Sequence, residues 1–524
     1  MARRIFIVLF FIPIVCQAQF SEQAFKFGKV LDWINHYYVD SVDQEKLVED
    51  AIVNMLKELD PHSVYYNKEE VNRMNEPLQG NFEGIGIQFN ILKDTLFVIS
   101  TISGGPSEKV GILAGDRILE VDGENIAGKG IENADVFRLL KGPKGTKVNV
   151  RIMRRNLKGL IDFTITRDRI PIYSIDAAYE IADGIGYIKL NRFAITTSNE
   201  FNEKINELKQ QGINDLILDL SNNGGGYLEE AISLADQFLE GRKSILYTEG
   251  VNSPRKEYMG SVKGEFEEGR VILIIDEGSA SASEIVAGAI QDWDRGVVVG
   301  RRSFGKGLVQ RPLMLPDGSM VRLTIARYYT PTGRLIQKPY ENGVDEYNND
   351  LINRYNSGEL SSKDSIHFPD SLKYYTLENK RVVYGGGGIM PDVFVPIDTT
   401  NVTPYYRSLI GKGLFNTFLL EYVDNNRKSL KNKYTDFSMY EESFEVDDEL
   451  LKKLVDYAEK NGLAYNEEEF QISREHIKLL VKAYVARDLW NTSEFYQVLN
   501  TQEKPILKAL EILQNKDIYK DKLK

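Results

Sequence analysis

The sequence predicts a multidomain α/β protein with a helical lead-in and a helical carboxyl-terminal extension. The chain has 524 residues, which is too many for one compact core. Residues 171–340 alternate short apolar strands with helices, which indicates a parallel sheet crossed by helices. Residues 80–169 show short strands separated by glycine-rich turns. We therefore expect a β-rich module followed by an α/β core.

Composition excludes some classes of function. Hydrophobic residues make up 42% of the chain, enough to fill real cores, so this is not a disordered protein. The formal net charge is −12, and no basic stripe is available to neutralise phosphates. Nucleic acid is therefore not an expected partner.

The amino terminus is typical of an export signal. Two arginines precede the apolar run Ile5–Val15, which is shorter than the about 20 residues that span a bilayer. We expect residues 1–18 to be a signal peptide and the protein to be exported to the periplasm or cell envelope. An uncleaved anchor and a lipid on Cys16 are the alternatives, and either would attach the protein to a membrane. Since Cys16 is the only cysteine, the mature protein would lack a cysteine nucleophile and a thiolate metal site.

The flanking segments suggest packing rather than chemistry. Residues 19–79 look helical, and the run ends at Asp60-Pro61-His62-Ser63 with no evident catalytic group. Residues 341–380 are rich in Asn, Asp, Ser and Tyr and look like an insertion or mobile loop. Residues 398–524 are mostly charged amphipathic helix, for which we expect helical support or contacts between copies of the chain.

Two predicted junctions between a strand and a helix suggest chemistry. They are Asp219–Gly226 and Gly278–Glu284, and each follows a strand of the predicted parallel sheet. Because the carboxyl ends of parallel strands form the ligand crevice of such sheets, the junctions would lie side by side. A helix start offers unpaired backbone N–H groups, and glycine lets the backbone approach a ligand closely. Together the junctions predict an oxyanion hole.

A nucleophile and a base are available beside these junctions. Ser281 lies in a run of small residues within reach of a substrate carbonyl, although a serine here also suits helix capping.

All four histidines lie outside residues 171–340, so a Ser-His-Asp triad is not expected. Lys306 follows the strand predicted at Gly296–Val299, and burial would keep its amine neutral, as a general base requires. Gln310 can hold that amine without adding a negative charge. The four histidines are His36, His62, His367 and His476.

A nucleotide site is the competing interpretation of the lysine motif. Gly300–Lys306 fits the phosphate-binding pattern GxxxxGK. The next residue is Gly307, however, so the Ser or Thr that binds magnesium is missing, and the following residues alternate like strands. We therefore expect no nucleotide.

Several long motifs occur in the order of one known family. They are Leu59–Ser63, Asn222–Gly226, Gly278–Ile285, Phe304–Gln310 and Gly387–Asp392. On these motifs, over residues 25–395, the chain resembles the carboxyl-terminal processing peptidases, also called tail-specific proteases. The resemblance implies a crotonase/ClpP-like α/β protease core over residues 170–397, a PDZ module over 80–169 and no metal or cofactor.

The resemblance also implies roles for particular residues. Ser281 corresponds to the nucleophile, Lys306 to the general base and Gln310 to its orienting partner. The amides of Gly226 and Ala282 correspond to the oxyanion hole. Asp292 matches an acidic position of the family and is expected to be structural.

The PDZ resemblance implies a site for protein tails. In such modules the amides of a glycine loop bind a terminal carboxylate, and the peptide adds as a strand beside the module's own sheet. The loop expected here is formed by Gly84, Ile85, Gly86 and Ile87, and the helix predicted at Ala134–Leu140 would line the side-chain pockets.

Two positions depart from the family pattern. Ser221 stands where the family usually has arginine, and Gly224 where proline or alanine is common. Neither change removes a catalytic group, but Ser221 is expected to alter the pairing near the site.

The expected protein is a serine endopeptidase that recognises carboxyl-terminal tails and processes exported proteins. Two further partners are left as alternatives: an adaptor protein that activates the protease, and a second copy of the chain bound through the terminal helices. One alternative is an inactive periplasmic binding or scaffold protein that uses only its PDZ module. Another is an acyl-CoA hydratase-like enzyme, which has no use for that module or an export signal.

Overall fold

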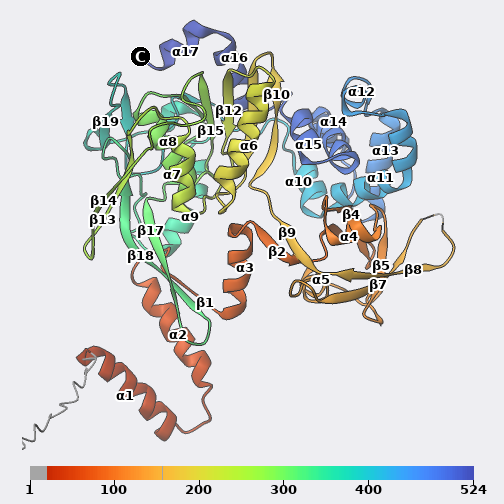
Figure 1. Cartoon of the computed structure of the whole chain (residues 1–524), viewed down its shortest axis with the longest axis horizontal. Helices are drawn as coiled ribbons and strands as arrows, with labels where there is room; N and C mark the ends of the chain where they lie inside the picture. Colours follow the sequence, from red (N-terminus) through yellow and green to blue (C-terminus); the bar gives the residue numbers. More distant parts are fainter. Residues whose placement is uncertain (1–20, 156) are drawn as a thin grey trace, which may run out of the picture.

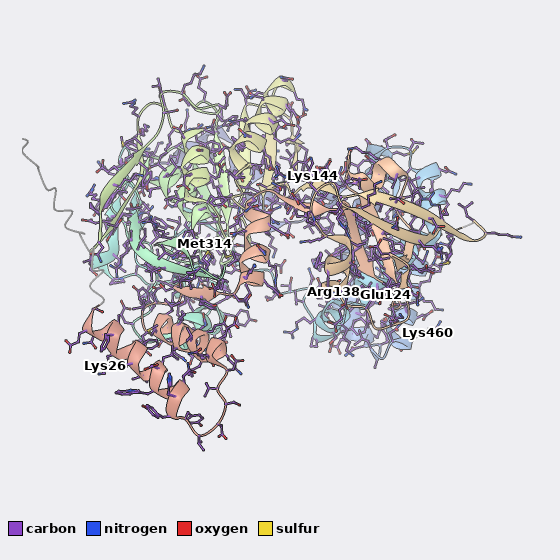
Figure 2. All side chains as sticks on the ribbon, turned by 60° about the horizontal axis from the view of Figure 1, so that its bottom comes forward. Lys26, Glu124, Arg138, Lys144, Met314 and Lys460 are labelled. Carbon is purple, nitrogen blue, oxygen red and sulfur yellow. The ribbon has the colours of Figure 1, made fainter. Side chains whose placement is uncertain are left out.

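The computed structural model describes residues 21–155 and 157–524. It has three bodies: an α/β core, a β-rich module and a helical region near the carboxyl end (Figure 1). Figure 2 shows Lys26, on the first helix, far from Glu124 and Lys144 of the β-rich module. The predicted signal peptide at 1–18 lies outside the described residues.

A six-stranded sheet forms the centre of the core, in the order β10-β11-β12-β15-β16-β21. Five of these strands run parallel, and only β10 is antiparallel to its neighbour. The strands are β10 (Ile175–Ala182), β11 (Ile185–Leu190), β12 (Asp215–Asp219), β15 (Val271–Ile275), β16 (Val297–Gly300) and β21 (Val393–Phe394). This confirms the parallel arrangement predicted from the alternating pattern.

Both faces of this sheet are covered, because its central strands are apolar at nearly every position. Leu216 and Leu218 of β12 pack with the first set of helices, whereas Ile217 between them packs on the opposite face. The first set is α6 (Thr197–Gln210), α7 (Leu228–Asp236) and α8 (Ala282–Asp292). The opposite face is covered by the last helices of the chain, α16 (Lys504–Gln514) and α17 (Lys516–Lys522).

A second, antiparallel sheet forms one wall of the core. Its order is β1-β18-β13-β14, and β17 also pairs with β18. The strands are β1 (Val64–Tyr66), β13 (Ser244–Gly250), β14 (Ser253–Met259), β17 (Leu308–Met314) and β18 (Met320–Tyr329). The amino-terminal segment thus contributes a strand to the core, which the helical prediction for residues 19–79 did not include.

The helical part of that segment is otherwise as predicted. It contains α1 (Glu22–Tyr37), α2 (Gln44–Lys57) and α3 (Lys68–Leu78). No residue of α1 is buried, and the helix extends away from the core (Figure 1). The sequence from α3 leads directly into the β-rich module.

The β-rich module is a separate sheet in the order β3-β4-β5-β7-β8, with β6 beside β5. The chain enters through β2 (Asn81–Gly84) and leaves through β9 (Asp168–Pro171), and these two strands pair as a hinge. The module contains β3 (Ile87–Ile91), β4 (Leu96–Thr101), α4 (Pro106–Val110), β5 (Arg117–Val121), β6 (Glu124–Asn125), α5 (Asn133–Leu140), β7 (Lys147–Met153) and β8 (Leu160–Thr166). The predicted pair of strands and the predicted helix are therefore present.

The helical region lies beside both other bodies. Its helices are α10 (Pro404–Gly411), α11 (Leu414–Lys433), α12 (Phe437–Ser443), α13 (Asp448–Lys460), α14 (Glu467–Leu489) and α15 (Thr492–Leu499). On α11, Asp424 accepts a hydrogen bond of 2.9 Å from Arg117 of the β-rich module. Its backbone oxygen also accepts one of 2.9 Å from Arg155. The helical region therefore holds the module as well as supporting the core.

Residues 341–380, for which an insertion or a mobile loop is expected, have regular structure, so the mobile-loop alternative is wrong. The segment contains α9 (Val344–Asn356), the short 3-10 turns η1 (Lys363–Ser365) and η2 (Asp370–Leu372), and β19 (Lys373–Tyr375), which pairs with β20 (Val382–Tyr384). Arg354 anchors α9 to the core, donating to the backbone oxygens of Arg302 at 2.6 Å and Ser303 at 3.2 Å. The polar composition does not indicate that the segment is anchored to the core, because the groups that anchor it are themselves polar.

Within residues 21–155 and 157–524, no helix combines the length and the apolar character needed to span a bilayer.

Candidate active site

Ser281 occupies a strained position at the start of α8. Its φ and ψ are 54° and −109°, a backbone conformation that residues other than glycine seldom adopt. Such strain persists only where the surrounding structure enforces it, and it is common at functional sites. Here it holds a half-buried hydroxyl at the helix amino terminus, beside the Ala282 amide.

Gly225 and Gly226 lie against the Ser281 turn. A Cβ atom on Gly225 would stand 2.9 Å from both the Ala282 nitrogen and the Ser281 Cβ, so only glycine fits there. A Cβ on Gly226 would stand 2.0 Å from the Phe193 backbone oxygen. In the described structure neither the Gly226 nor the Ala282 amide donates a hydrogen bond. Both amides are thus free to bind an oxyanion.

The carboxylate of Glu284 joins the serine turn to the lysine turn. One oxygen accepts from the amides of Ser281 at 2.8 Å and Lys306 at 2.9 Å. The other accepts from the Gly305 amide at 2.7 Å and the Ser303 hydroxyl at 2.5 Å. Glu284 is completely buried, and burial raises its pKa while these hydrogen bonds oppose the rise.

Sequence reasoning missed Glu284. The available signal was its position three residues after Ser281, where a glutamate can reach back to the first backbone N–H of a helix. Its contacts with Ser303, Gly305 and Lys306 join segments far apart in the sequence and could not be predicted from that spacing.

Lys306 is half-buried and has a lowered pKa. Burial is the largest cause, the positive charge of Arg322 adds to it, and together they lower the pKa of Lys306 to about 8. Glu284 and Asp60 act in the opposite direction. A substantial fraction of the amine is therefore uncharged at mildly alkaline pH.

Tyr328 also joins the backbone segment of Ser281 to that of Lys306. Its hydroxyl is 2.7 Å from the Lys306 backbone oxygen and 3.2 Å from that of Ser281. No hydrogen bond joins Ser281 Oγ to Lys306 Nζ in this structure, although both residues are described. Such contacts are often long without substrate and tighten when substrate binds.

Gln310 lies near this site but not on the lysine amine. Its side-chain nitrogen is 3.4 Å from the Leu308 backbone oxygen and 3.5 Å from the Thr324 hydroxyl. Thr324 in turn donates to Asp60 at 3.0 Å. The structure therefore connects Gln310 to the Asp60 segment instead of giving it a hydrogen bond to Lys306.

His62 lies in the same neighbourhood, which the sequence did not indicate. Its Nε2 atom is 2.6 Å from the hydroxyl of Tyr347, on α9. Burial, and next the charge of Lys306, lower the pKa of His62 to about 3, so this ring is neutral. The packing role expected for residues 60–63 therefore extends to the surroundings of the lysine.

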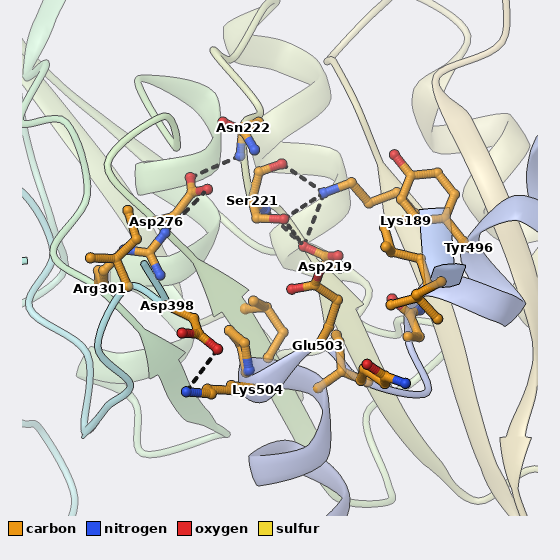
Figure 3. Close-up of a pocket in the computed structure, with 18 of the residues that line it drawn as sticks. Lys189, Asp219, Ser221, Asn222, Asp276, Arg301, Asp398, Tyr496, Glu503 and Lys504 are labelled. Atoms are coloured by element: carbon orange, nitrogen blue, oxygen red, sulfur yellow. Dashed lines mark hydrogen bonds and ion pairs between the residues drawn. The ribbon is translucent and has the colours of Figure 1, made fainter. Parts of the chain in front are cut away.

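Ser221 takes part in a polar group with Lys189 and Asp219. The nearly buried Lys189 amine donates to Asp219 at 3.0 Å and to the Ser221 hydroxyl at 2.7 Å. Figure 3 shows this group at the wall of a cavity of about 470 Å³, between the core and the helical region. Ser221 is thus joined to Lys189 and Asp219, and its hydroxyl also donates to Asp219 at 2.6 Å.

Asp292 stands at the far end of α8 and is fully buried. It forms an ion pair with Arg334 and accepts a hydrogen bond of 2.8 Å from the Thr332 hydroxyl. These contacts attach α8 to the segment after β18, in keeping with a structural role.

The glycine loop of the β-rich module is fixed at the edge of its sheet. Ser107 donates through its amide at 3.0 Å and its hydroxyl at 2.7 Å to the Ile85 backbone oxygen. Gly86 has a φ of +74°, and Gly84 is paired with Asp168 in the hinge. Ile87 begins β3, an edge strand, so a peptide can add beside it.

These observations define a class of protein. A strained serine beside free backbone amides, with a lysine of lowered pKa held by the same carboxylate, has the parts of a serine hydrolase. No group of three or more His, Cys, Asp or Glu side chains suited to a metal ion occurs in the described residues.

Comparison with known proteins identifies the segments. Residues 184–346 match Peptidase family S41, and residues 97–154 match the PDZ domain. Residues 15–70 match the Activating protease CtpB N-terminal domain. Residues 405–491 match a family of unknown function, DUF8443.

Two curated relatives each match 60% of the chain. The Carboxy-terminal-processing protease of Bartonella bacilliformis is 36% identical over 60% of this chain and 73% of its own length. The Carboxy-terminal processing protease CtpB of Bacillus subtilis is 35% identical over 60% of this chain and 65% of its own length. A solved photosystem II D1 C-terminal processing protease is 28% identical, covering 60% of this chain and 84% of that one, with a TM-score of 0.36.

The chain belongs to peptidase family S41. It is a serine peptidase of the carboxyl-terminal processing type and carries a PDZ domain, as the motifs predicted.

Proposed function

We propose that this protein cleaves exported proteins with Ser281 as nucleophile and Lys306 as general base, and that its PDZ domain binds their carboxyl-terminal tails. The observation that carries the catalytic assignment is the Glu284 carboxylate, which binds the backbone of both residues. A common support keeps their relative position constant, as a reacting pair requires.

The proposed reaction begins with neutral Lys306. Its amine takes the proton from Ser281 as Oγ bonds to the substrate carbonyl carbon. The Gly226 and Ala282 amides bind the resulting oxyanion, for which one such donor contributes about 3–4 kcal/mol. The peptide C–N bond then breaks, and the proton passes from Lys306 to the leaving amine. Lys306 then takes a proton from water as the water oxygen bonds to the acyl carbon, and it returns that proton to Ser281 Oγ as the ester bond breaks.

The proposed role of the PDZ domain rests on its exposed strand edge. β3 has a free side, and α5 lies next to it, since the rings of Phe89 and Phe137 are 5.6 Å apart. A tail added to β3 would lie beside α5, with its carboxylate at the loop of Gly84, Ile85, Gly86 and Ile87.

The central test compares the purified protein with Ser281→Ala and Lys306→Ala on β-casein, an unfolded protein. Loss of cleavage in both variants, with retained thermal unfolding curves, is the expected result. Full activity of Lys306→Ala would contradict the assignment of the base. Full activity of Ser281→Ala would contradict the nucleophile.

Export is tested separately. The mass of the protein recovered from the cell envelope should correspond to a chain that begins at Gln19, because residues 1–18 are proposed to be removed. A chain that retains these residues would support an anchor instead.

A further inference from the structure

Arg322 is a positive charge close to the proposed catalytic lysine. It lies on β18, paired with Val64 of β1 on one side and Pro312 of β17 on the other. Thr324, two residues along, shares its face of the strand and binds Asp60 at 3.0 Å. Arg322 therefore lies on the part of β18 that extends toward α3.

No carboxylate neutralises this guanidinium within the described part of the chain. One terminal nitrogen is 3.7 Å from the Met74 sulfur, and the group lies 5.2 Å from the centre of the Tyr66 ring. Both are weak partners for a cation. The Nε atom is buried and has no hydrogen-bond acceptor at all. Buried polar atoms without partners are rare, and such an atom calls for an explanation.

Three other cations of this region each have a carboxylate partner. Arg301 and Arg302 are paired with Glu277 and Glu359 at 2.7 Å. Lys338 is paired with Asp350 at 3.0 Å. Arg322 differs from these three cations in having no carboxylate partner among the described residues.

The strand β18 connects Arg322 to the proposed catalytic group. Tyr328, on the same strand, has its hydroxyl beside the backbone oxygens of Ser281 and Lys306. An extended chain advances about 3.3 Å per residue, so the strand from Tyr328 to Arg322 spans about 20 Å. A peptide that runs along β18 with its scissile bond at Ser281 would therefore reach Arg322 within about six residues. The positive charge of Arg322 also contributes to lowering the pKa of Lys306.

We infer that Arg322 is a specificity-determining residue that binds a carboxylate of the peptide substrate a few residues from the scissile bond. This inference rests on the proposed function of Ser281. A planar guanidinium binds a carboxylate through two parallel hydrogen bonds, which suits it to this task better than an ammonium. A peptide offers this group in two places, the Asp or Glu side chain and the free carboxyl terminus.

Binding to inactive protein tests the inference without relying on cleavage. The probes are fluorescent peptides of one sequence with blocked ends, carrying Asp or Asn at a series of positions, and a neutral peptide ending in a free carboxylate or a carboxamide. Their affinities are measured for Ser281→Ala and for Ser281→Ala/Arg322→Gln. The PDZ domain is the same in both proteins, so its contribution cancels in the comparison.

We expect Arg322→Gln to weaken binding of the recognised carboxylate peptides about ten-fold or more and to leave the neutral, blocked peptides unchanged. A loss confined to Asp peptides identifies the side chain as the source, and a loss confined to the free terminus identifies the terminus. Equal affinities of the two proteins for every peptide would overturn the inference.

Kinetics with otherwise unmodified protein provides the second readout. Arg322→Gln should raise KM for the recognised peptide with little change in kcat at saturating pH, and Arg322→Lys should recover part of the loss. Arg311→Gln, on the exposed face of β17, is the matched control and should behave as the parent. A uniform fall in kcat for charged and neutral peptides would indicate a structural role and contradict the inference. If Ser281→Ala stays active, the proposed function fails, while the binding comparison still decides the role of Arg322.

Discussion

The protease core and the PDZ domain are held in place by different kinds of bond. In the core, Glu284 fixes the turns of Ser281 and Lys306 through their backbone amides, inside a fully buried environment. The PDZ domain is attached by the β2–β9 hinge and by side chains such as Arg117, bonded to Asp424. The first arrangement fixes two turns of the proposed catalytic site, and the second joins the PDZ domain to the core and to the helical region.

The largest effect is expected from Glu284→Gln. The amide would present N–H groups to backbone donors that need an acceptor, so the two turns would separate. A displacement of about 1 Å can reduce the rate about a hundred-fold. The kcat on β-casein peptides measures this, with Glu229→Gln, on the exposed start of α7, as control. A kcat within two-fold of the parent would show that the common support is dispensable.

The pH dependence of kcat/KM is expected to report Lys306. Because the base must be neutral, the rate should rise with pH and level off above about 8, the pKa of this lysine. Removing the positive charge in Arg322→Gln raises that pKa, so the rising limb should move to higher pH. Arg322→Lys retains a charge and should keep the limb near its original position. An unchanged limb in Arg322→Gln would mean that its charge does not act on Lys306.

The smallest effect is expected where the PDZ domain meets the helical region. Asp424→Asn removes the charge that faces Arg117 and Arg155, at a cost of about 1 kcal/mol of interaction free energy. Amide hydrogen exchange in β2 and β9 should become faster, while cleavage of short peptides changes little. High salt should bring the parent protein toward the variant, since it screens such pairs. Identical exchange in both proteins would show that the hinge alone holds the PDZ domain.

Much of the core could be predicted because its elements carry local signals. The strands β12, β15 and β16 are short apolar runs, and the glycines and serines that follow β12 and β15 are typical of helix starts. The direction of the pKa shift of Lys306 also follows from the sequence, because burial of an amine always lowers its pKa.

The missed features depend on distant contacts. His62 and Tyr347 meet although 285 positions separate them, and neither has a local pattern that predicts the other. The role predicted for Gln310 depends on the rotamer of a side chain, which spacing does not fix, and its amide lies beside Leu308 and Thr324. Polar composition likewise suggested a mobile loop where Arg354 anchors a helix.

The position of α16 and α17 has a consequence for how the enzyme matures. These helices cover one face of the protease sheet, with Ile512 and Leu513 packed near Ile272 and Tyr519 bonded to the Val271 backbone. Ribosomes make this segment after every strand that it covers. One face of the protease sheet consequently stays uncovered on a growing chain until synthesis has passed residue 519.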